Sequence, residues 1–203
     1  MARRIFFSFH YERDAWRAGQ VRNSNVVSAE DRAGFIDSAQ WESIKKKGDA
    51  AIQNWIEEQL NNTSVTVVLI GAETASREWV QHEILASWNR GNGLVGVRIH
   101  NIKDHNQKID LAGRNPFEDF KLPDGTLLSS ACRTYDWLTD DGRRNLGKWA
   151  NEAADKRAGY KNGDKIAQLV ESTKVNKSYR SAPATVGFTP RSPWCPDHAA
   201  TRR

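Results

Sequence analysis

The segment SREWVQHEI, residues 76–84, contains a carboxylate, Glu83, that has no opposite charge at helical spacing. The segment has neither Gly nor Pro, so it is compatible with a helix, in which residues three and four positions apart are neighbours. The neighbours of Glu83 on such a helix are Trp79, Val80, Ala86 and Ser87. None is a cation, which leaves two interpretations. Either Glu83 lies at the solvent-exposed border of an amphipathic helix, or it is held among apolar side chains, where its pKa is raised and it can contact a ligand.

Three short apolar runs predict the strands that position this helix. They are RIFFSF at 4–9, AGFIDS at 33–38 and SVTVVLIG at 64–71. Open parallel sheets bind ligands at the carboxyl ends of their strands. The residues expected there, facing the helix that carries Glu83, are Ser8, His10, Tyr11, Asp37, Ser38 and Trp41. A polar and aromatic cleft with one isolated carboxylate suits a sugar or a nucleotide.

Strands and helices are expected to alternate along the whole chain. In the run at 64–71 the apolar residues, which fall on both faces as in a buried central parallel strand, are Val65, Val67, Val68, Leu69 and Ile70. The other segments with helical spacing or strand-like apolar runs are 52–60, 80–88, 94–100, 132–137 and 141–158. This order predicts an α/β fold, a flavodoxin-like three-layer sandwich with a mainly parallel sheet of about five strands.

The last part of the chain differs in composition from the rest. Residues 174–203 contain six basic side chains and one acidic side chain, which accounts for the whole net charge of +5, and four of the six prolines. We therefore expect a domain at 1–173, including its C-terminal helices, and a basic, extended or disordered tail at 174–203. Because the basic residues are spread along the tail, the charge pattern does not favour a nucleic-acid partner.

The sequence predicts a cytoplasmic protein with no membrane segment. Its longest apolar run, VTVVLI, is far shorter than the roughly 20 residues of a spanning helix. The N-terminal apolar patch is interrupted by charged residues before the core of a signal peptide could form.

Several catalytic signatures are missing. The chain has no GxxxxGK[ST], GxGxxG, HExxH or GxSxG segment, which removes support for kinases, dehydrogenases, zinc proteases and α/β-hydrolases. Its five histidines show no metal-ligand spacing, so we expect no metal site.

The order of segments resembles that of a TIR domain. The matching pieces are IFFSFHYERD, GFIDS, TVVLIG and TASREWVQHEI, and the last is similar to the Ser...Trp...Glu segment of TIR enzymes that cleave NAD. The variant GAETASREWVQHEI, together with VRNSNVV, resembles the TIR-like domain of bacterial Thoeris antiphage-defence proteins. The resemblance covers about residues 3–140.

The resemblance assigns roles to particular residues. It implies that Glu83 is the catalytic glutamate and that Trp79 is the Trp one turn before it. It places Ser8, Phe9 and His10 in a loop that helps to line the nucleotide pocket. Asp37 and Ser38, at the start of the second-strand loop, and Tyr11 complete the predicted substrate-binding residues. Val80 stands where plant TIR domains usually have Cys, a position that varies in bacterial members.

The chemistry that the resemblance implies needs NAD as substrate and no cofactor. Cleavage of the bond between nicotinamide and ribose develops an oxocarbenium-like sugar and a neutral leaving group, so a single carboxylate is sufficient. Capture by water gives ADP-ribose, and capture by a hydroxyl or ring nitrogen of the same molecule gives a cyclic isomer. Thoeris TIR proteins are of the second kind, and their cyclic product acts on a separate effector protein. Self-association and a phage-derived trigger are the candidate activators.

Two other classes of protein are alternatives to a TIR enzyme. A non-catalytic TIR adaptor or scaffold would act only through protein contacts; Glu83 at the catalytic position counts against it, and nicotinamide release from NAD would exclude it. A flavodoxin-like receiver would require a cluster of acidic residues after the first strand, which the sequence lacks.

Overall fold

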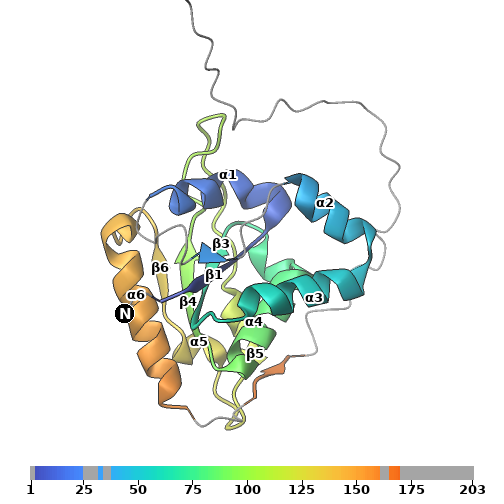
Figure 1. Cartoon of the computed structure of the whole chain (residues 1–203). Helices are drawn as coiled ribbons and strands as arrows, with labels where there is room; N and C mark the ends of the chain where they lie inside the picture. Colours follow the sequence, from blue (N-terminus) through green and yellow to red (C-terminus); the bar gives the residue numbers. More distant parts are fainter. Residues whose placement is uncertain (1–2, 25–31, 34–37, 161–164, 170–203) are drawn as a thin grey trace, which may run out of the picture. The chain divides into compact units, whose positions relative to one another are not determined.

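The fold is that of a computed structural model, which describes residues 3–24, 32–33, 38–160 and 165–169 of the chain (Figure 1). The tail predicted at 174–203 lies outside these ranges, and its boundary with the domain stays a prediction. Asp37 of the predicted cleft also lies outside them.

A five-stranded parallel sheet forms the centre of the described domain. Its order is β2-β1-β3-β4-β6, and every neighbouring pair is parallel. The strands are β1 Ile5–Phe9, β2 Arg32–Ala33, β3 Val65–Ile70, β4 Gly93–Arg98 and β6 Thr134–Asp136. All six residues of β3 are buried, because helices cover both faces of this central strand. The predicted flavodoxin-like α/β fold with about five strands is confirmed.

Helices cover the two faces of the sheet (Figure 1). Helices α1 (Tyr11–Arg22) and α6 (Gly142–Ala158) contribute buried residues to a cluster on one face. Helices α3 (Asp49–Leu60) and α4 (Glu78–Arg90) contribute to the clusters on the other face, and α2 (Ser38–Lys46) contacts α3. None of the helices in the described ranges has the length and apolar character needed to cross a bilayer.

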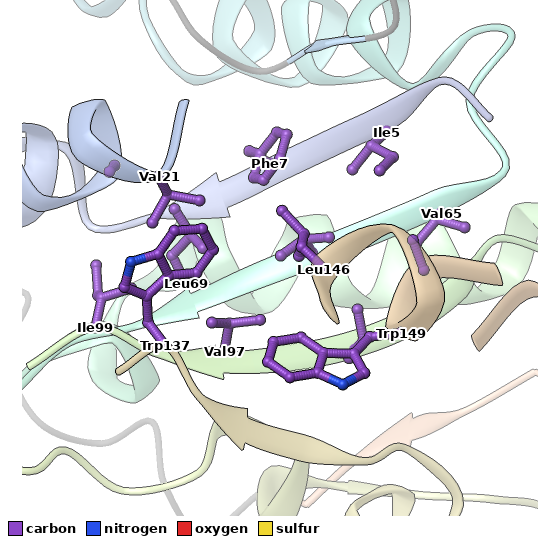
Figure 2. Packing of buried hydrophobic residues seen from close by; sticks show 14 of the residues in the cluster. Ile5, Phe7, Val21, Val65, Leu69, Val97, Ile99, Trp137, Leu146 and Trp149 are labelled. Carbon is purple, nitrogen blue, oxygen red and sulfur yellow. The ribbon is translucent and has the colours of Figure 1, made fainter. Parts of the chain in front are cut away.

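The larger apolar cluster joins three strands to α6, as Figure 2 shows. Phe7 of β1, Leu69 of β3 and Val97 of β4 meet Leu146 and Trp149 of α6. Their side chains share one face because alternate residues of a strand point the same way. Burial of these large apolar groups holds α6 against the sheet.

The opposite face of β1 has a different character. Phe6 packs with Ile52 and Ile56 of α3, and the next residue on the same face is Ser8, whose side chain is fully buried. A buried hydroxyl among apolar neighbours requires a hydrogen-bond partner. The partner of Ser8 lies in α4 and defines the site described below.

The connection from β4 to β6 holds short elements that the sequence did not predict. A 3₁₀ turn, η2 (Pro116–Asp119), leads into β5 (Phe120–Lys121), which pairs antiparallel with β7 (Ala167–Gln168). The remaining short elements are η1 (Thr74–Ser76) and α5 (Leu128–Ala131).

Candidate active site

Glu83 lies on the inner face of α4, against the end of β1. Its side chain is only 7% exposed, and its Oε2 accepts a hydrogen bond of 2.5 Å from the hydroxyl of Ser8. Burial raises the pKa of Glu83 to about 8, and the bond from Ser8 opposes that shift. Among the described residues no cationic nitrogen lies within 4.0 Å of its carboxylate. Glu83 therefore does not lie at the solvent-exposed border of the helix.

A cavity of about 340 Å³ opens beside this carboxylate. It lies at the carboxyl end of β1, between the start of α1 and helices α2, α3 and α4. The residues that line it are Phe7, Phe9, His10, Tyr11, Glu12, Lys45, Asp49, Ile52, Trp55, Arg77, Trp79, Val80 and Glu83. The cavity combines aromatic side chains with both signs of charge, as nucleotide sites do.

The structure brings together most of the predicted site residues. Phe9, His10, Tyr11 and Trp79 line the cavity with Glu83. Ser8 is not part of the lining and contacts Glu83 from the sheet side. Ser38 begins α2, but its side chain and that of Trp41, like Asp37, lie outside what the structure describes.

The ring of His10 is part of the cavity lining. His10 precedes the first turn of α1 and is 8% exposed, and its buried Nδ1 has no hydrogen-bond partner among the described residues. Burial lowers the pKa of His10, and the nearby positive charge of Arg77 lowers it further. A neutral imidazole with a lone pair available is the form expected near pH 7.

Charged residues that sequence reasoning missed surround the cavity. Lys45 of α2 lies 2.8 Å from Glu12 of α1, and Arg77 pairs with Glu73. Glu73 also accepts a bond of 2.6 Å from Arg13. Lys45 belongs to the run KKK, a pattern that is typical of a solvent-exposed surface. Only the packing of α2 beside the start of α1 places it at the cavity.

A second buried carboxylate, Asp14, lies behind the site. It is fully buried in α1, burial raises its pKa to about 6, and Arg17, 3.6 Å away, opposes that shift. The carboxyl group lies so close to Gly71 that a Cβ on that glycine would come within 2.2 Å of it. A larger residue in place of Gly71, just after β3, would therefore force the Asp14 carboxyl group to move.

A parallel flavodoxin-like sheet with a buried glutamate on the helix after its central strand is the arrangement of a TIR-like domain. A family model described as "Thoeris protein ThsB, TIR-like domain" matches residues 6–104, which include every residue that lines the cavity beside Glu83. A protein of Bacillus cereus (strain MSX-D12), named "Putative cyclic ADP-D-ribose synthase ThsB1", is 35% identical over 192 residues, covering 74% of this chain and 100% of the relative. The chain belongs to the TIR-like Thoeris ThsB family.

Proposed function

We propose that this protein cleaves NAD between nicotinamide and ribose and closes the remaining ADP-ribose into a cyclic isomer. The observation that carries the proposal is Glu83, a buried carboxylate that faces a nucleotide-sized cavity and has no cationic partner among the described residues. The printed name of the Bacillus relative, a cyclic ADP-D-ribose synthase, supports the same reaction.

Glu83 is the group proposed to stabilise the reacting sugar. When the glycosidic bond breaks, its electron pair leaves with nicotinamide, which becomes neutral, and positive charge develops on the ribose. An ionised Glu83 next to that ribose attracts the charge and can hold its hydroxyls. The positive charge of bound NAD favours ionisation of a carboxyl group whose pKa is about 8 when the cavity is empty. Ser8 fixes the orientation of the carboxylate.

His10 is the proposed acceptor of the proton released on cyclisation. A hydroxyl of the same molecule that attacks the sugar forms a new carbon–oxygen bond and must lose its proton. The ring of His10 lines the cavity, and its lowered pKa keeps it neutral near pH 7, so it can accept that proton. Asn at this position would keep the polarity of the side chain but could not accept the proton.

The other cavity residues are proposed to bind the two ends of the substrate. Trp79, Phe9 and Tyr11 offer rings that can stack on nicotinamide or adenine. Lys45 and Arg77 are the cations that line the cavity and can bind the pyrophosphate. Asp37 and Ser38 stay as predicted contributors from the second-strand loop. The reaction draws on these side chains and needs neither a metal nor a cofactor, because the leaving group is neutral.

The biological setting is proposed from the family. The cyclic product would act as a second messenger on a separate effector protein in antiphage defence, after self-association or a phage-derived trigger activates the enzyme. The cytoplasm, where NAD is abundant, is the proposed compartment.

The test is to incubate the full chain with NAD and to identify the products by chromatography and mass spectrometry. We expect nicotinamide and a cyclic ADP-ribose isomer, and we expect Glu83→Gln to lower the rate of nicotinamide release by about two to three orders of magnitude. Because activation by a trigger is part of the proposal, the assay is repeated in extracts of phage-infected cells that express the chain. Equal nicotinamide release by the two proteins, or none in either setting, would favour the adaptor alternative.

A further inference from the structure

A second cavity, of about 250 Å³, lies between the end of α4, the segment from α5 to β6, and α6. It shares no lining residue with the cavity beside Glu83. Its lining consists of Trp88, Leu94, Val95, Ala131, Cys132, Arg133, Tyr135, Trp149, Glu152, Ala153, Lys156, Arg157 and Tyr160. We call it the α6 cavity.

A buried cation, Arg157, lines the α6 cavity. Arg157 is only 5% exposed, yet no carboxylate of the described chain pairs with it. Its Nη2 and Nη1 donate to the backbone oxygens of Trp88, at 3.1 Å, and Tyr160, at 3.4 Å. Its buried Nε has no hydrogen-bond partner in the ranges that the structure describes. A guanidinium stays charged in proteins, so burial without an anion is costly.

The other charges at the α6 cavity do not supply the missing anion. Lys156 is exposed and has no ion pair within the part of the chain that the structure describes. Arg133 approaches Glu152 only to 3.9 Å. Burial raises the pKa of the Cys132 thiol to about 12, so the sulfur is neutral at physiological pH. Three cations therefore line the α6 cavity against one carboxylate.

The remaining wall of the α6 cavity is flat and apolar. The rings of Tyr135 and Trp149 stack with centroids 4.2 Å apart and an interplanar angle of 3°. Trp88 lies under the guanidinium of Arg157, with 4.5 Å between the guanidinium carbon and the ring centroid, and meets Tyr160 edge to face. Aromatic walls next to arginine and lysine suit a ligand that joins a phosphate to a ring.

We infer that the α6 cavity binds a small phosphate-bearing molecule, of about the size of a nucleoside monophosphate, with its phosphate on Arg157 and Lys156. The ligand would supply the anion that the buried guanidinium lacks. The inference does not depend on the reaction proposed for Glu83, because it uses none of the residues of that site.

The test is calorimetric titration of the full chain with AMP, inorganic phosphate and adenosine. AMP should bind, phosphate should bind more weakly, and adenosine, which lacks the anion, should not bind measurably. Arg157→Gln and Lys156→Gln should each weaken AMP binding about tenfold or more, the scale of one charge-assisted contact. Lys156 is exposed, so its substitution keeps the test valid even if Arg157→Gln does not fold.

Two control variants locate the binding. Arg143→Gln removes an exposed charge from the same helix and should not change AMP binding. Lys45→Gln removes a cation from the cavity beside Glu83, where the AMP half of NAD is also proposed to bind; the loss of AMP affinity caused by Lys156→Gln should be the same with and without it. Three results would overturn the inference: no AMP binding up to about 1 mM, adenosine binding as tightly as AMP, or AMP binding that Lys45→Gln weakens and Lys156→Gln does not.

Discussion

Glu83→Gln should stabilise the folded protein by an amount that grows with pH. Burial raises the pKa of Glu83 from its ordinary 4.5 to about 8, so the folded state favours the protonated carboxyl group. The stability that this contributes is fully present below pH 4.5 and is lost as pH rises towards 8. Glutamine has a similar size, can still accept the bond from Ser8 and does not titrate.

The size of the effect follows from the same two values. At about 1.4 kcal/mol per pH unit, the gap between 4.5 and about 8 corresponds to at most about 5 kcal/mol above pH 8. At pH 7 the expected gain of the variant is about 3 kcal/mol, and at pH 4 it is close to zero. A gain of this size at a conservative substitution is exceptional, since most single changes destabilise.

The assay is urea unfolding of both proteins between pH 4 and 9, followed by tryptophan fluorescence. Asp14, whose pKa is raised to about 6, makes the stability of both proteins fall with pH and cancels in their difference. Glu78→Gln, an exposed change on the same helix, is the control and should alter the free energy of unfolding by less than about 0.5 kcal/mol at every pH. A difference between wild type and Glu83→Gln that is the same at pH 5 and pH 8 would refute a buried, neutral Glu83.

Four further predictions concern activity and domain limits. The kcat/KM for nicotinamide release should rise about tenfold per pH unit below pH 8 and level off above it, because ionised Glu83 is the active form; a flat profile from pH 6 to 9 would contradict this. His10→Asn should leave nicotinamide release within a few fold but lower the ratio of cyclic product to ADP-ribose, which mass spectrometry measures; an unchanged ratio would remove His10 as the base. EDTA should leave turnover unchanged, and strong inhibition would point to a metal. A chain ending at Thr173 should melt cooperatively close to the full-length temperature in calorimetry, and a loss of many degrees would move the domain boundary.

Much of the fold could be predicted because its strands and helices carry strong local patterns. The mostly apolar run of β3 and the helical spacing of Val80, Ile84 and Trp88 predict elements that the structure contains. The small sheet of β5 and β7 could not be predicted, because it joins two pairs of residues more than forty positions apart. Strands of two residues have no periodicity to detect.

The candidate site could be predicted only in part, for a related reason. The lack of a cation at helical spacing from Glu83 is visible in the sequence, but its burial and its contact with Ser8 depend on packing across 75 positions. Lys45 and Glu12 are 33 positions apart and meet only because α2 returns to the start of α1. From the sequence alone, charged side chains such as these are expected on the solvent-exposed surface.

One helix forms a wall of both cavities. Glu83 and Trp88 are five residues apart on α4, which places them roughly 7.5 Å apart along the helix axis. A helix segment of this length moves as a rigid unit, so a small displacement of α4 changes the shape of both cavities at once. Ligands in the two cavities are therefore expected to alter each other's affinity, and thermodynamic linkage requires the change to be equal in both directions.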